Sequence, residues 1–262
     1  MALLRYYVKR ASKSEKQIPH PAQTAGIRDD KVVRNGAAKL GRELFYGTRR
    51  KRNYKKAFPF LLQGATEGSI HSQYLAAYAL ANGLGTKRNF DRARYWYTRV
   101  VRNAPPDAIA EAAFDLAITY TERGSKADLR AARYWYGRAI QNGHPEAPFN
   151  LARMYETGEG TKPNPRKSFL LYKKGAKRGD PWAQCNLAIC YAEGLGTAKN
   201  IRESVRWFRK AANQGDAKSQ YNVGLAYLDG EGVRTSEKHA RRWFLKAARQ
   251  GHKRAKRLLR KT

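Results

Sequence analysis

Residues 180–196 read DPWAQCNLAICYAEGLG, and residues 201–215 complete the phrase as IRESVRWFRKAANQG. Residues 216–251 repeat it in register, with the same small, aromatic and glycine positions. The glycines that close successive copies lie 36 residues apart: Gly143, Gly179, Gly215 and Gly251. A fixed period of this length indicates stacked supersecondary units rather than one globular core.

The phrase extends upstream with more variation. The copy over residues 107–143 has Arg123-Gly124 where the others have Gly-x-Gly, and an earlier copy keeps the characteristic spacing from Gly47 to Ala57. We therefore expect six repeats within residues 33–251, at about 33–68, 69–106, 107–143, 144–179, 180–215 and 216–251.

Each copy predicts two helices, because apolar residues recur at helical spacing and the Gly-x-Gly separates the halves. Glycines at this break supply the positive φ that ends the first helix. No segment alternates with period two, so no strand is expected. An aromatic pair recurs in the second helices, and its register favours a core role between repeats over a base-stacking surface. In four copies the pair begins with a tryptophan: Trp96, Trp135, Trp207 and Trp243.

The full phrase is A-x-x-x-L-A-x-x-Y-x-x-G-x-G, followed by A/S-x-x-W-F/Y-x-K-A-A-x-x-G. It resembles the Sel1-like repeat family, a branch of the tetratricopeptide-like α-solenoids, throughout residues 33–251. The resemblance implies an all-α, right-handed solenoid of six helix-turn-helix units that acts as an adaptor, with no catalytic residue. It further implies that second helices form the outer layer and first helices line a concave groove for a protein partner. Pro59 and the loose copy at 107–143 depart from the pattern and predict local irregularity there.

Charge divides between the two predicted helix layers. The chain has 53 Lys and Arg against 21 Asp and Glu, a formal net charge of +32. The six predicted first helices sum to zero, and the six predicted second helices sum to +20, in the windows 53–65, 90–102, 128–140, 166–178, 201–213 and 237–249. Stacking at a fixed period would align these helices into one basic stripe. A solvated surface ordinarily mixes both signs, so the imbalance favours a phosphate-bearing or acidic partner.

Clusters of cations at both ends of the repeats extend the predicted stripe, and arginine suits bidentate contact with phosphate. The candidate contact residues are Arg49, Arg50, Lys51, Arg52, Lys55, Lys56, Arg166, Lys167, Lys173, Lys174, Lys177, Arg178, Arg206, Arg209, Lys210, Arg241, Arg242, Lys246, Lys253, Arg254, Lys256 and Arg257.

The sequence therefore predicts a non-enzymatic scaffold. Its basic second-helix layer would dock on the phosphate backbone of RNA or DNA, within a ribonucleoprotein or a DNA-handling assembly, and its near-neutral groove would bind protein. The alternative is a protein-only adaptor in secretion, envelope or host-interaction work, with the charge facing an acidic protein or an anionic membrane surface. A third explanation is that compositional bias alone, without an anionic partner, accounts for the net positive charge.

Motifs for catalysis, cofactor binding and metal binding are not found, and we expect no catalytic, cofactor-binding or metal-ligating residue. Cys185 and Cys190 lie on one predicted helix and are expected to be buried, reduced thiols. His144 and His252 each follow a repeat glycine, which predicts a role in the turn.

The two ends of the chain lie outside the repeats. Residues 1–32 predict a basic, extended or disordered arm, and residues 252–262 predict a basic capping helix. No apolar run reaches the length of a membrane span. We expect a cytoplasmic protein, or a mitochondrial one if residues 1–28 form a presequence.

Overall fold

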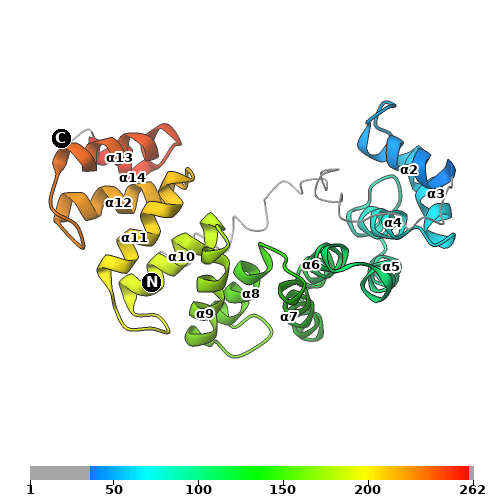
Figure 1. The fold of residues 1–262 in the computed structure, drawn as a ribbon, viewed down its shortest axis with the longest axis horizontal. Helices are drawn as coiled ribbons and strands as arrows, with labels where there is room; N and C mark the ends of the chain where they lie inside the picture. The colour runs from blue at the N-terminus through cyan, green and yellow to red at the C-terminus, as the bar shows by residue number, and fades with distance from the viewer. Residues whose placement is uncertain (1–35, 260–262) are drawn as a thin grey trace. The chain divides into compact units, whose positions relative to one another are not determined.

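A computed structural model describes residues 36–259, and all regular elements in that range are helices (Figure 1). The predictions for the arm at residues 1–32, including the presequence, and for Arg260 and Lys261 lie outside the described residues. In chain order the helices are α2 (Gly36–Tyr46), α3 (Tyr54–Thr66), α4 (Ile70–Asn82), α5 (Phe90–Asn103), α6 (Pro106–Arg123), α7 (Lys126–Gln141), α8 (Ala147–Thr157), α9 (Pro165–Lys177), α10 (Pro181–Glu193), α11 (Ile201–Asn213), α12 (Ala217–Asp229), α13 (Glu237–Arg249) and α14 (Lys253–Leu259).

The chain divides after Leu116 into two compact units, an N-terminal and a C-terminal one. In the N-terminal unit α2 packs on α3, α3 on α4, and α4 on α5. In the C-terminal unit the same chain of contacts runs from α7 through α8, α9, α10, α11, α12 and α13 to α14. The second helices α3, α9, α11 and α13 thus each pack on their own first helix and on the helix that follows. The predicted all-α solenoid of helix pairs is confirmed, and its right-handed sense stays a prediction.

The loop between paired helices is shaped by the Gly-x-Gly. Gly194 ends α10 with φ of 75°, and its N–H donates to the carbonyl of Cys190. Gly196 has φ of 71°, and a Cβ there would collide with the carbonyl of Pro165 in the preceding repeat. Both positions require glycine, one to end a helix and one to let the repeats approach.

The same loop returns the chain to the first helix and starts the second. The N–H of Asn200 donates to the carbonyl of Tyr191 at 2.7 Å, and its side chain then accepts from the N–H of Glu203 at 3.0 Å. This side chain satisfies one of the free N–H groups at the start of α11. Equivalent N-caps begin the other second helices and recur largely at the repeat period: Asn53, Asn89, Ser125, Asn164 and Ser236.

The second helices are amphipathic, with a buried apolar side and an exposed basic side. In α11 the side chains of Val205, Trp207 and Phe208 are buried, and Arg206 and Arg209 between or beside them are exposed. Trp207 and Phe208 pack in one core cluster that also contains Tyr172 of the preceding repeat. The predicted core role of the recurring aromatic pair is confirmed in α5 and α11, where both rings are buried, whereas in α7 and α13 the second ring is buried and Trp135 and Trp243 are half-buried.

The structure also bears on the predictions for the cysteines, for Pro59 and for the loose copy at 107–143. Cys185 and Cys190 are free, buried thiols on α10, as expected. The helix α3 runs without interruption through Pro59, so the predicted irregularity does not break it. The loose third copy instead shows its departure as a longer first helix, since α6 has 18 residues and α10 and α12 have 13 each.

Within residues 36–259, no helix combines the length and the apolar character that crossing a membrane requires.

Candidate nucleic-acid interface

Two positions are basic in all four second helices of the C-terminal unit. The early cationic position lies in the first two turns of each helix, and the late cationic position lies eight residues further along. Members of each set lie 36 residues apart. The early set is Arg130, Arg166, Arg202 and Lys238, and the late set is Arg138, Lys174, Lys210 and Lys246.

Both sets lie on the solvent side of their helices. All eight side chains are exposed except that of Arg138, which is half-buried. Eight residues correspond to about 12 Å along a helix axis, so each helix presents two cations at that axial separation. Stacked repeats place equivalent positions side by side in successive units, and the two positions therefore form two rows across the C-terminal unit.

The acidic residues of these helices do not occupy either row. The helix α9 contains no acidic residue and carries a net charge of +5, and α13 carries +4. Asp128 of α7 is buried, and its carboxylate lies 3.4 Å from the Arg123 guanidinium. The first helices α8 and α12 are each neutral in sum, and α10 carries −1. The predicted division of charge between the two sets of helices therefore holds within this unit.

Several of the predicted cations are held in place by aromatic rings. The Lys210 Nζ lies 4.1 Å from the centre of the Trp207 ring, and the Lys246 Nζ lies 4.4 Å from the Trp243 ring. Arg209 donates through Nη2 to the Tyr227 hydroxyl at 3.0 Å. These contacts restrict the side chains and leave donors available, which lowers the entropic cost of binding an anion.

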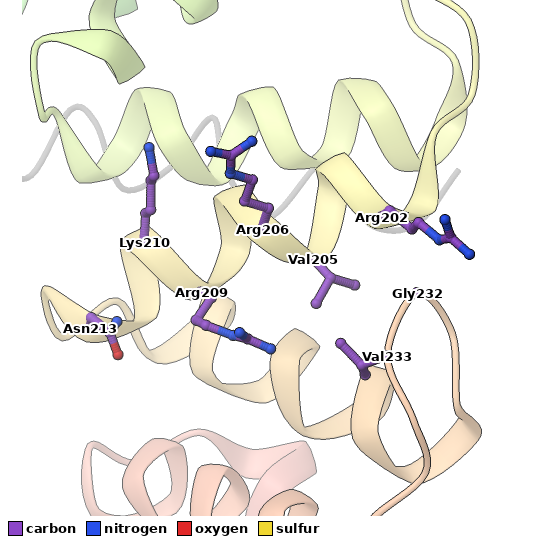
Figure 2. A pocket seen from close by; sticks show the side chains of 8 residues that line it. All are labelled: Arg202, Val205, Arg206, Arg209, Lys210, Asn213, Gly232 and Val233. Atoms are coloured by element: carbon purple, nitrogen blue, oxygen red, sulfur yellow. The ribbon is translucent and has the colours of Figure 1, made fainter.

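The cations of α11 surround a shallow hollow of about 340 Å³ (Figure 2). Val205 of α11 and Val233 of the loop before α13 are part of its lining, and Figure 2 shows Arg206 and Lys210 extending from the helix in the same direction. No acidic side chain lines it; the lining residues are Arg202, Val205, Arg206, Arg209, Lys210, Asn213, Gly232 and Val233. The four cations in the lining give the hollow a positive potential, which attracts anions.

The other predicted contact residues of this unit are distributed along α9, α13 and α14. Arg166, Lys167, Lys174 and Lys177 of α9 are exposed, and Lys173 is half-buried. The remaining exposed residues are Arg241, Arg242 and Lys246 on α13 and Lys253, Arg254, Lys256 and Arg257 on α14.

Arg178 makes a contact that joins two helices of one repeat. Its Nη1 donates to the His144 carbonyl at 3.2 Å and ties the end of α9 to the turn before α8. His144 and His252 do lie in the turns, as predicted, and each accepts through Nδ1 from a backbone N–H near the start of the following helix.

In the N-terminal unit the predicted cluster lies around Glu43. The guanidinium groups of Arg49 and Arg50 lie 3.8 and 3.7 Å from its carboxylate, and the three side chains line a separate hollow of about 530 Å³. This carboxylate offsets part of the local charge. Arg52 donates to the Tyr46 carbonyl at 3.2 Å, and the exposed Lys51, Lys55 and Lys56 complete the cluster.

The early cationic position was missed by sequence reasoning at Arg130, Arg202 and Lys238, and the late position at Arg138. The signal was present in the sequence, since Arg130, Arg202 and Arg138 each lie 36 residues from a predicted contact residue at the equivalent position, and Lys238 lies two periods, 72 residues, from Arg166. Counting charge by helix had obscured it, because the sum does not show which positions recur.

One known protein family matches most of the chain. A family model described as Sel1 repeat matches residues 35–69, 70–99, 110–144, 145–180, 183–216 and 217–252. The chain belongs to the Sel1 repeat family. Sel1 repeats form scaffolds for protein–protein interaction, and this chain accordingly has an adaptor fold.

Solved Sel1-repeat structures share the fold. A Sel1 repeat protein from Oxalobacter formigenes is 26% identical, with a TM-score of 0.65 over 82% of this chain and 86% of that one. The protective antigen c5321 of uropathogenic Escherichia coli is 23% identical, with a TM-score of 0.50 over 84% of this chain and 54% of that one. Among curated protein sequences no significant match was found.

Proposed function

We propose that this Sel1-repeat protein is a non-enzymatic scaffold that binds nucleic acid and protein with different helices. The second helices of the C-terminal unit bind the phosphate backbone of RNA or DNA, and the first helices bind a protein partner. The observation that carries the proposal is the recurrence of basic residues at both cationic positions in α7, α9, α11 and α13.

A regular row of cations suits a regular row of anions. Nucleic acid presents phosphates at a fixed repeat, and each phosphate that a cation neutralises releases condensed counterions. Arginine fills most of the early positions and can contact a phosphate through two N–H groups, whereas lysine fills most of the late positions and acts as a point charge. Binding of this kind depends on charge and depends little on base sequence.

The test is the salt dependence of binding to a labelled random oligonucleotide, followed by fluorescence anisotropy. We expect measurable affinity at low salt that falls steeply with salt, with a slope of about −0.7 to −0.9 in log K per phosphate contacted. The variant Arg202→Gln/Lys210→Gln removes one cation from each row and should reduce that slope by about two.

A matched control makes the same change in net charge on the other layer. Asn186→Asp/Asn222→Asp on α10 and α12 also lowers the formal charge by two, and it should leave the slope nearly unchanged. Equal effects of the two variants would show that only net charge matters, and absence of binding at low salt would refute the proposal. Displacement of the oligonucleotide by anionic liposomes, but not by neutral ones, would favour the membrane alternative.

A further inference from the structure

Two tyrosines are exposed at one repeat position. Tyr95 of α5 and Tyr134 of α7 each come immediately before the recurring tryptophan, and they are 51% and 56% exposed. A tyrosine ring ordinarily gains stability from burial, and the aromatic pairs that follow these two are largely buried. The exposed rings therefore do not belong to the core between repeats.

Each tyrosine ring is nevertheless fixed. Tyr95 packs edge-to-face on Trp96, with ring centres 5.0 Å apart and planes at 76°. Tyr134 packs in the same way on Trp135, at 5.1 Å and 79°. The contact with the tryptophan restricts each tyrosine ring, and about half of each tyrosine side chain remains exposed to solvent.

An arginine one turn further along accompanies each ring. The Arg99 Nη1 donates to the Tyr95 hydroxyl at 2.9 Å, and its guanidinium lies 5.8 Å from the ring centre. The Arg138 Nη1 makes the longer equivalent contact to the Tyr134 hydroxyl, at 3.4 Å. An exposed ring beside a cation is the combination that binds a base and its phosphate in single-stranded nucleic acid.

We propose that Tyr95 with Arg99, and Tyr134 with Arg138, each bind one unpaired base of single-stranded RNA. The tyrosine stacks on the base, and the arginine contacts the adjoining phosphate. The inference rests on the proposed function and adds a substrate class to it. Duplex bases are stacked on one another and have no free face, whereas RNA loops and ends offer unpaired bases that proteins stack on aromatic side chains.

The type of residue at the repeat position of Tyr95 and Tyr134 changes from one second helix to the next. After Tyr95 and Tyr134, the equivalent residues in α9, α11 and α13 are Leu170, Arg206 and Arg242. Stacking is thus available in α5 and α7, and further phosphate contact in α11 and α13. Each tyrosine–arginine pair acts within its own compact unit, so the proposal needs no particular arrangement of the two units.

The experiment compares three ligands at low salt by fluorescence anisotropy with the full chain. They are a single-stranded RNA 12-mer, an abasic strand with the same number of phosphates, and a duplex of the same length. We expect the single strand to bind more tightly than the abasic strand. In Tyr95→Ala/Tyr134→Ala, affinity for the single strand should fall about tenfold for each ring lost, and affinity for the abasic strand should not change.

Two control variants separate stacking from other effects. Tyr95→Phe/Tyr134→Phe keeps both rings and should keep most of the affinity. Leu170→Ala removes an apolar side chain that is 55% exposed at the same repeat position, and it should have no effect on RNA binding. Circular dichroism and thermal melting check that all variants are folded.

The outcomes distinguish the two proposals. If no strand binds at low salt, both are wrong. If the single strand and the abasic strand bind equally tightly, the stacking inference is wrong and the phosphate proposal stands. The same conclusion follows if the double alanine variant binds RNA as tightly as the parent while Arg202→Gln/Lys210→Gln weakens the binding of both strands. Tighter binding to single-stranded DNA of the same sequence would overturn the assignment to RNA.

Discussion

Gln214 donates through Nε2 to the Oε1 of Gln184 at 2.8 Å and thereby joins the end of α11 to the buried face of α10. The same nitrogen lies 3.0 Å from the Gly179 carbonyl, which it also reaches as a donor. Gln184 in turn donates to the Ala176 carbonyl of α9 at 3.2 Å. One repeat later Gln250 and Gln220 make the same contact at 2.9 Å, so glutamine links recur between repeats.

Replacing Gln184 should weaken the contact between repeats. Gln184 is 5% exposed, and Gln184→Leu leaves the Gln214 amide without one acceptor while keeping the side-chain volume. We expect the free energy of unfolding to fall by about 1–3 kcal/mol, as measured by urea denaturation. The exposed Gln63 side chain donates to the Glu67 side chain, and Gln63→Leu should change stability by less than about 0.5 kcal/mol. Similar losses of unfolding free energy in both variants would show that the buried Gln184–Gln214 hydrogen bond stabilises the fold no more than a surface contact does.

The two thiols of α10 should be inert in the folded protein. Burial raises the pKa of both Cys185 and Cys190 to about 12, so neither forms a thiolate near neutral pH. An aromatic disulfide reagent at pH 8 should react with neither thiol in the native chain and with both after denaturation. The folded state binds more protons than the unfolded state above about pH 9, so the free energy of unfolding should decrease as pH rises from there. Rapid modification of the native protein would contradict this.

Glycine substitutions should have graded effects that depend on backbone and space. Gly196→Ala meets both a positive φ and the Pro165 carbonyl, and we expect more than about 2 kcal/mol of destabilisation. Gly215 has φ of 98° but open space, so Gly215→Ala should cost about 1–2 kcal/mol. Gly137 lies inside α7 with open space, and Gly137→Ala should stabilise by about 0.5–1 kcal/mol. Thermal melting of the three variants gives the order; any other order would contradict this account.

His252 should make the C-terminal helix sensitive to acid. Burial lowers the pKa of His252, with a further contribution from Arg254; Lys218 also lowers it, and Asp216 raises it. The folded state therefore binds fewer protons than the unfolded state at and below about pH 6.5, and stability should decrease as pH falls through that range.

The variant His252→Asn tests this acid sensitivity, because asparagine can still accept from the Ala255 N–H but does not titrate. Melting temperatures between pH 7 and pH 5 should decrease less in the variant than in the parent. An equal decrease would assign the acid sensitivity to other groups.

The sequence by itself determined the fold class, the helix pairs and the core position of the recurring aromatics. These follow from the 36-residue period, since each repeat must bury the same face against its neighbours. The glycine positions and the N-caps follow from the sequence too, because positive φ and free N–H groups restrict those positions to few residue types. The unequal charge of the two sets of helices could also be predicted, since charge is a property of composition.

Only the tertiary structure decided which side chains at these positions are used internally and which remain at the surface. Arg178 and Arg209 are similar in sequence, yet Arg178 ties the end of α9 to a turn, whereas Arg209 donates to the Tyr227 hydroxyl of α12 and also lines the hollow on α11. Tyr95 belongs to a run of aromatics, and only packing shows that Trp96 occupies the core and Tyr95 does not. The physical reason is that burial of a helix position depends on the side chains that the next repeat places against it, and those residues are distant in sequence.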